Sequence, residues 1–270
     1  MKSIVIAWCA LLLLSPLPAV SAELKEVTFS GEIVDGVNRL AGETADLVTT
    51  PFEVSNNNIL ITLGVAGAVG LTYAFDRQIQ DRLTAGQNHT LDRITDTGSV
   101  IGDPFLHLGL AVLVYGGGIA ADSAEWKETG EMIGEALILA DATTLILKEA
   151  TGRGRPDTTS AKGDFRPFGF RQDYDSMPSM HTSSSFALAS VLASRTDSIA
   201  LKTAYYSTAA FVGYSRVYQN RHWASDVLLG AALGELCGRV VTGFHANGGR
   251  LALTPAVYEK GAGLAMVGTW

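Results

Sequence analysis

The chain has few cysteines and few charged residues. It holds 2 cysteines in 270 residues, and Cys9 lies in the apolar stretch at the N-terminus. Cys237 alone remains beyond that stretch, and a single thiol cannot form an internal disulfide. Charged residues make up 17% and hydrophobic residues 47% of the chain, against roughly 25% charged in an average soluble domain. This balance favours a membrane protein or a very apolar helical bundle.

Positive charge is also scarce. Lysine and arginine number 20 against 27 acidic residues, which gives a formal net charge of −7. Proteins that bind nucleic acid neutralise its phosphates with basic faces, so this balance argues against a nucleic-acid partner.

The first 22 residues have the pattern of an export signal. Lys2 supplies a positive charge, residues 4–14 form a short apolar stretch, and residues 20–22 (Val-Ser-Ala) offer a cleavage site. The stretch is about half as long as the roughly 20 residues of a bilayer-spanning helix, and a retained anchor is the alternative. We therefore expect an exported protein of the cell envelope, located in the periplasm or on the periplasmic face of a membrane.

The remaining sequence predicts an all-α fold. Six apolar blocks are rich in Ala, Gly and Leu and are mostly too long for strands, so we expect a bundle of about six core helices over residues 58–245. Alternating apolar residues predict a short β-hairpin-like tail over 246–270. The six blocks are Ile59–Phe75, Phe105–Ala121, Ile133–Leu147, Phe186–Ala193, Ile199–Tyr214 and Val227–Val241.

The segment 23–57 is polar, but apolar side chains recur in it at near-helical spacing. This predicts a short amphipathic helix that lies on the core or on a membrane surface. The apolar residues are Val34, Val37, Leu40, Ala41 and Val48.

The sequence leaves the relation to the membrane open. The first two apolar blocks have 17 residues each, the lower limit for a span. Glu135 and Asp141 interrupt the third block, and charges at membrane depth are costly unless they face the interior of the bundle. Both an integral membrane protein and a compact periplasmic bundle fit this pattern.

Three polar clusters follow one another along the second half of the chain, at residues 148–156, 178–181 and 215–226. They contain cationic side chains that match phosphate oxygens, and a Pro-Ser step that would present free backbone N–H groups at a helix start. The clusters therefore predict a phosphate site. The residues expected to bind phosphate are Lys148, Arg155, Ser179, Met180 through its N–H, and Arg216.

Two histidines in these clusters suit phosphoryl transfer. His222 and Asp226 are four residues apart, so on a helix the carboxylate would orient the imidazole and leave its other nitrogen free to attack phosphorus. His181, from another helix, would protonate the leaving oxygen. No second histidine or cysteine lies at ligand spacing from His222, so we expect neither metal nor cofactor at this site.

The three clusters together resemble the type 2 phosphatidic acid phosphatase superfamily. That superfamily includes lipid phosphate phosphatases, bacterial acid phosphatases and vanadium haloperoxidases, and its pattern is Lys-x6-Arg-Pro, Pro-Ser-Gly-His and Ser-Arg-x5-His-x3-Asp. The chain has all three parts in order, except that Met180 replaces the glycine. The resemblance implies a metal-independent phosphatase with a phosphohistidine on His222. A methionine keeps the N–H but loses the freedom of a positive φ, which puts the size of the substrate in question.

The resemblance leaves several activities open. The leading hypothesis is hydrolysis of a lipid phosphate or an isoprenyl diphosphate, and the alternative is a periplasmic acid phosphatase for soluble esters. A vanadium-dependent haloperoxidase and a non-enzymatic envelope protein are further alternatives. Three other histidines, His89, His107 and His245, lie outside the pattern, and we interpret them as structural or surface groups.

Overall fold

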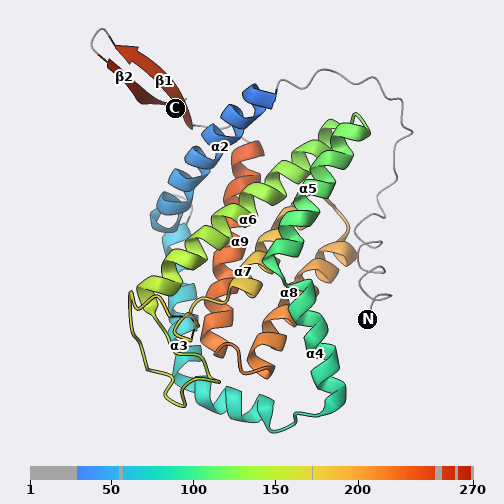
Figure 1. Cartoon of the computed structure of the whole chain (residues 1–270), viewed down its shortest axis with the longest axis vertical. Helices are drawn as coiled ribbons and strands as arrows, with labels where there is room; N and C mark the ends of the chain where they lie inside the picture. The colour runs from blue at the N-terminus through green and yellow to red at the C-terminus, as the bar shows by residue number, and fades with distance from the viewer. Residues whose placement is uncertain (1–28, 55–56, 172, 247–250, 259–260, 269–270) are drawn as a thin grey trace.

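The computed structural model of the chain describes residues 29–54, 57–171, 173–246, 251–258 and 261–268. The predicted export signal lies outside these residues. The described part is a helical bundle with a two-stranded antiparallel ribbon, which confirms the predicted all-α class (Figure 1). Its elements are α2 (Phe29–Thr49), the 3-10 helix η1 (Thr50–Phe52), α3 (Asn58–Thr84), α4 (His89–Ile101), α5 (Pro104–Ala120), α6 (Ala124–Thr151), α7 (Met180–Ser194), α8 (Ile199–Tyr218), α9 (Ala224–Ala246), β1 (Leu251–Tyr258) and β2 (Gly261–Gly268).

Local sequence signals set the limits of several helices. The side chain of Asn88 accepts hydrogen bonds from the first N–H groups of α4, and Asp103 caps α5 in the same way, with a proline following it. Gly152 ends α6 in the left-handed conformation, with φ at 55°. A Cβ atom there would lie 2.0 Å from the carbonyl oxygen of Arg166, so only glycine fits where the chain leaves α6 for the long loop.

The core lies between α5, α6, α7 and α9, and it depends on very close helix packing. A Cβ atom added at Gly234 of α9 would lie 2.1 Å from the backbone oxygen of Ser183 on α7. Gly230 and Gly238 face α7 in the same way, as their four-residue spacing predicts. The buried apolar side chains on α6 are Met132, Ile133, Ala136, Leu137, Leu139 and Ala140.

One helix that the apolar blocks do not contain is α4. Because α4 is amphipathic and mostly polar, its residues form no long apolar run. The helix packs against α8. The six predicted blocks correspond to α3, α5, α6, α7, α8 and α9.

The predicted amphipathic segment contains α2, but the helix turns a different face to the bundle. Val34, Val37 and Val48 are all more than half exposed, whereas Leu47 and the carboxylate of Glu43 are buried. Of the two predicted contacts, the core and a membrane surface, these exposed valines leave the membrane surface for their face of the helix. A charged residue was not expected on the buried face.

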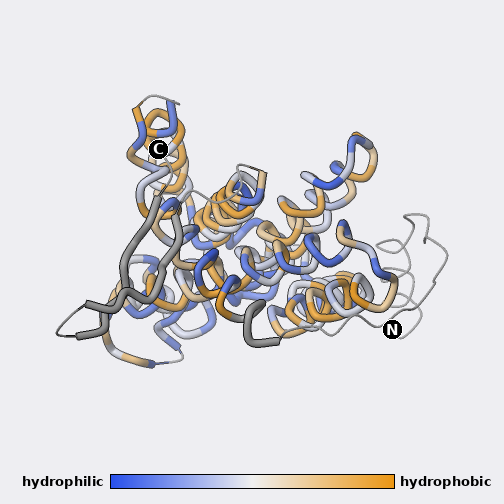
Figure 2. Tube along the Cα trace, turned by 90° about the horizontal axis from the view of Figure 1, so that it is seen from above, coloured by the Kyte–Doolittle hydropathy of each residue, from blue (hydrophilic) through white to orange (hydrophobic). Residues whose placement is uncertain are grey.

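Large apolar side chains are also exposed on the outside of the bundle. Figure 2 shows hydrophobic residues along most of its helices. On α5, for example, Leu113 is 73% exposed, and on α3 Leu63 is 62% exposed. By length and composition, two of the described helices, α3 and α9, are suited to cross a membrane. A third crossing arises if α4 and α5, which are bent by 49° at their junction, count as one span. Such an apolar exterior is unusual for a soluble protein and indicates a membrane location.

Candidate active site

The three polar clusters meet at one end of the bundle. Lys148 lies in the last turn of α6, and His181 lies in the first turn of α7. Arg216 lies in the last turn of α8, and His222 belongs to the short loop before α9. These four helices alternate in direction, so the ends that carry the clusters come together (Figure 1).

His222 is buried, and one of its two ring nitrogens, Nδ1, makes a hydrogen bond. Its Nδ1 lies 2.6 Å from the carbonyl oxygen of Ser176. A carbonyl oxygen only accepts, so Nδ1 carries the proton and Nε2 keeps its lone pair. Burial lowers the pKa of His222 to about 4, with Lys148 and Arg155 adding to the decrease and Asp226 opposing it. The ring is therefore neutral near pH 7 and has a nucleophilic nitrogen.

Asp226 lies beside His222, as the spacing predicts, and both residues make a hydrogen bond to Ser176. The Oδ2 of Asp226 is 3.9 Å from Nδ1, beyond hydrogen-bond length. This oxygen accepts instead from the Ser176 hydroxyl at 2.6 Å and from the Trp223 N–H at 2.9 Å. Helix α9 begins at Ala224, after His222, so the two residues do not have helical i, i+4 geometry.

Arg153 holds Asp226 in place, and no sequence motif distinguishes it from the other arginines of the loop. Its guanidinium is fully buried and pairs with Asp226 at 2.5 Å and with Asp76 of α3 at 2.7 Å. The Ser225 hydroxyl accepts a third hydrogen bond from it at 2.8 Å. This network connects α3, the long loop and α9 beneath the site. The sequence contains no local signal for this network, because Asp76 and Arg153 are 77 residues apart and meet only in the folded chain.

Two of the predicted phosphate-binding cations share one carboxylate. Arg155 donates two hydrogen bonds to Asp175, at 2.7 and 2.8 Å, and Lys148 donates to the backbone oxygen of the same residue. Burial lowers the pKa of Lys148 to about 8, although Asp175 opposes the decrease. Asp175, which belongs to none of the three motifs, therefore lies against both cations.

Ser179 and Met180 form the start of α7. Ser179 is fully buried and makes no side-chain cap hydrogen bond; its hydroxyl accepts from Thr182 at 2.9 Å. The hydroxyl proton of Ser179 thus remains available for an anion. Met180 is the first helical residue and is not among the described non-glycine residues with a positive φ. The methionine therefore fits this backbone without strain.

Arg216 and His181 complete the site. The guanidinium of Arg216 is buried and donates to the Ser99 hydroxyl and to the amide oxygen of Gln219. Burial lowers the pKa of His181 to about 3, and the charges of Arg216 and His222 lower it further. A neutral His181 in the free protein needs a proton from the bound substrate or solvent before it acts as an acid.

The histidines outside the pattern have different environments. His107 is buried and structural: its Nδ1 lies 2.9 Å from the Ser184 hydroxyl, and its Nε2 lies 2.7 Å from the Ile101 carbonyl oxygen. His89 is exposed at the start of α4. His245, however, contacts carboxylates of α2 and α6, so it has partners that the sequence did not reveal.

Comparison with known proteins gives the class of this domain. Residues 132–250 match the family model of the PAP2 superfamily, and this range contains all three clusters. This match confirms the resemblance to the superfamily that the three motifs indicate.

Two similar proteins are named lipid A 1-phosphatase. The chain is 32% identical over 191 residues to the lipid A 1-phosphatase of Porphyromonas gingivalis, an alignment that covers 68% of this chain and 38% of that protein. It is 34% identical over 94 residues to the lipid A 1-phosphatase of Rhizobium johnstonii, covering 33% of this chain and 36% of the relative. The matched region is thus less than two fifths of these relatives' own length.

Two solved structures share the fold. One is LpxE of Aquifex aeolicus, with a TM-score of 0.51 and 22% identity, over 62% of this chain and 93% of that one. The other is the transmembrane PAP2 type phosphatidylglycerolphosphate phosphatase of Bacillus subtilis, with a TM-score of 0.53 and 22% identity, over 70% and 94% of the two chains. At this identity the likeness supports the fold alone.

Proposed function

We propose that the chain is a metal-independent phosphatase of lipid phosphates that works through a phosphohistidine on His222. The observation that carries the proposal is the hydrogen bond from Nδ1 of His222 to the Ser176 carbonyl oxygen. It leaves Nε2 as the unprotonated nitrogen, on the side chain that the PAP2 motif marks as nucleophile.

In the proposed first step, Nε2 of His222 attacks phosphorus and the bond between phosphorus and the ester oxygen breaks. His181 gives a proton to the leaving oxygen, and Lys148, Arg155 and Arg216 stabilise the charge on the phosphoryl oxygens. In the second step a water molecule gives its proton to His181 and attacks the phosphohistidine. The P–N bond breaks, and inorganic phosphate leaves.

The apolar exterior supports a lipid rather than a soluble ester as substrate. The site lies at one end of helices whose outer faces are apolar, so a phosphate on a lipid head group would reach it at a membrane surface. The relatives named lipid A 1-phosphatase make a phosphorylated glycolipid the first candidate. We further propose that the site opens to the periplasmic face, in line with the predicted export signal.

Phosphate release from mixed micelles tests the proposal. The panel contains lipid A, phosphatidylglycerolphosphate, phosphatidate, an isoprenyl diphosphate and a soluble aryl phosphate, all in EDTA. We expect His222→Gln to lower release by on the order of 1,000-fold or more, because the covalent route is lost. The exposed His89→Gln serves as the control and retains full activity. Equal release by wild type and His222→Gln on every substrate contradicts the proposal.

The role of His181 has its own test. A poor alkoxide leaving group needs a proton, whereas an aryl phosphate leaves with little help. We therefore expect His181→Gln to slow lipid substrates far more than the aryl phosphate. A uniform decrease on both would assign His181 to binding instead of proton transfer.

A further inference from the structure

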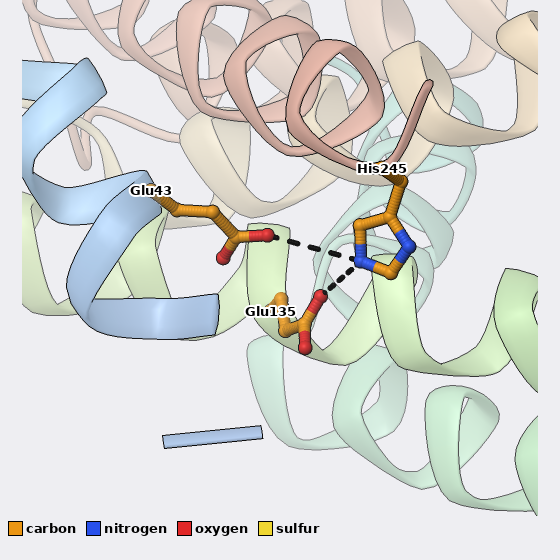
Figure 3. Close-up of side chains that lie close together, drawn as sticks. All are labelled: Glu43, Glu135 and His245. Atoms are coloured by element: carbon orange, nitrogen blue, oxygen red, sulfur yellow. Dashed lines mark hydrogen bonds and ion pairs between the residues drawn. The ribbon is translucent and has the colours of Figure 1, made fainter. Parts of the chain in front are cut away.

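At the opposite end of the bundle, three ionisable side chains from three helices point toward one another (Figure 3). Glu43 comes from α2, Glu135 from the N-terminal half of α6, and His245 from the last turn of α9. We propose that these residues bind a divalent transition-metal ion, with Zn²⁺ as the first candidate, and that the ion fastens α2 to the bundle. This site is separate from the phosphatase site and does not depend on the proposed function.

The ligand atoms already lie close to the positions that an ion requires. The Nε2 of His245 is 2.6 Å from Oε2 of Glu135 and 3.8 Å from Oε1 of Glu43, and one such atom from each residue lies within 4.8 Å of the others. Zinc bonds to nitrogen and oxygen of about 2.0–2.2 Å place neighbouring tetrahedral ligands about 3.3 Å apart. Small rotamer changes would therefore place the three ligand atoms at three corners of a tetrahedron. The fourth corner is then open for a water molecule.

Glu43 gives an independent reason to expect a ligand. Its side chain is fully buried, and neither carboxylate oxygen has a hydrogen-bond partner among the described residues. Arg39, one turn before Glu43 on α2, is engaged instead by Glu135 at 2.8 Å and by Glu131 at 3.4 Å. A buried carboxylate without hydrogen bonds is unstable unless a cation or a proton neutralises it. Oε1 of Glu43 faces the imidazole of His245, so a metal ion between them would supply that neutralisation (Figure 3).

The surroundings of the three residues are those of metal ligands. The second oxygen of Glu135, Oε1, accepts the hydrogen bond from Nε of Arg39, which leaves Oε2 for the ion. The second nitrogen of His245, Nδ1, lies 3.8 Å from Oε1 of Glu128. Ligating carboxylates are commonly hydrogen-bonded in the way that Glu135 is, whereas Glu128 at 3.8 Å is an ion-pair neighbour of His245 and not a hydrogen-bond partner.

The ligand types select the kind of ion. An imidazole with two carboxylates suits Zn²⁺ and neighbouring first-row ions, whereas Ca²⁺ and Mg²⁺ prefer sites made of oxygen alone.

The position of the cluster in the bundle indicates a structural role for the ion. Glu135 and Lys148 lie on the same helix, and their separation along α6 corresponds to about 20 Å at 1.5 Å per residue. An ion at the cluster therefore does not touch the phosphate site, and it links α2, α6 and α9.

Metal binding by the intact chain tests the inference. The tag-free protein is purified in detergent, stripped with EDTA, dialysed and then mixed with Zn²⁺ alone. We expect about one tightly held zinc per chain and a melting temperature raised by several degrees, because the ion binds the folded state. Mg²⁺ and Ca²⁺ should produce much smaller shifts. Phosphate release in EDTA at moderate temperature should persist, so failure of this inference and failure of the phosphatase proposal are distinguishable.

Matched variants distinguish the proposed metal ligands from residues that do not bind the ion. Glu43→Gln and His245→Gln should each lose the retained zinc and the thermal shift, whereas Glu125→Gln, exposed on α6, and His89→Gln should retain both. Visible absorption of Co²⁺ bound to the wild-type chain gives a readout that needs no variant. Zinc retention that is absent in the wild type, or unchanged in the two ligand variants, overturns the inference. A higher melting temperature of metal-free Glu43→Gln with no zinc effect in the wild type would also overturn it, and would assign a shared proton to the two glutamates.

Discussion

At the scale of single residues, the site combines a buried histidine with buried cations. Such an arrangement keeps His222 neutral and lowers the proton affinity of Lys148, because burial disfavours the charged form of both. The two groups therefore need opposite protonation states. In the proposed mechanism, His222 attacks without a proton on Nε2, and Lys148 binds phosphate only when it is protonated.

This requirement predicts the pH dependence of kcat/KM, which reports the free enzyme. Activity should fall below about pH 4, where His222 becomes protonated, and above about pH 8, where Lys148 loses its charge. Lys148→Arg should abolish the decrease near pH 8, because a guanidinium remains protonated there. The measurement is a pH series at low substrate concentration. An alkaline decrease that is identical in Lys148→Arg would contradict the assignment to this lysine.

Arg153 is the residue on which the buried network depends. Arg153→Met would leave the carboxylates of Asp76 and Asp226 buried without their cation. We expect a loss of about 3–5 kcal/mol in the free energy of unfolding, the usual effect of removing one partner of a buried pair. Thermal unfolding in detergent measures it. Arg171→Met is the control: its ion pair with Asp173 is exposed, and the unfolding midpoint should not move.

At the scale of helices, the contact between α7 and α9 determines the geometry of the site. Gly230 lies against the backbone of Ser179, where a Cβ atom would be 2.6 Å from the carbonyl oxygen. The same two helices carry His181 near the start of α7 and Asp226 in the first turn of α9. Glycines on α9 therefore set the distance between the predicted acid and the group that positions the nucleophile.

Gly234→Ala tests this packing away from the catalytic residues. The added methyl group would meet backbone atoms of α7 at 2.1 and 2.9 Å, so the helices must separate. Overpacking of this kind costs about 1–3 kcal/mol. Gly64→Ala on α3 is the matched control, because no atom lies within 4 Å of its added Cβ, and it should be neutral or stabilising by up to ~1 kcal/mol. Equal melting temperatures for the two variants would argue against the close contact.

At the scale of the whole molecule, the bundle has two polar ends and an apolar outer surface. The phosphate site lies at one end and the cluster of Glu43, Glu135 and His245 at the other. Between them, α3 and α9 are long and apolar enough to cross a membrane. This arrangement supports a protein embedded in the envelope with its phosphate site at one membrane surface.

Extraction of native membranes tests that placement. We expect the chain to stay in the membrane pellet after an alkaline carbonate wash and to enter the detergent phase on partitioning, because exposed apolar residues on α3 and α5 would otherwise face water. Release into the aqueous phase would favour the soluble acid phosphatase alternative. A periplasmic protein without membrane contact serves as the reference for complete release.

The sequence by itself determined the helical class and the resemblance to the PAP2 superfamily, and its motifs marked the candidate site residues. Helical periodicity and glycine spacing are local properties, and Lys148, His181 and His222 belong to motifs that are each shorter than about a dozen residues. Local patterns of this kind are readable because they depend on neighbours along the chain.

Only the tertiary structure decided which partners these residues have. It brings Asp76 of α3 to Arg153, gives Nδ1 of His222 to the Ser176 carbonyl oxygen, and buries Glu43 beside His245. The chain order contains no signal for such contacts, since the partners lie tens to hundreds of residues apart and meet only when the helices pack. Buried charges must then find partners in space, because the bundle interior offers too little water to stabilise them.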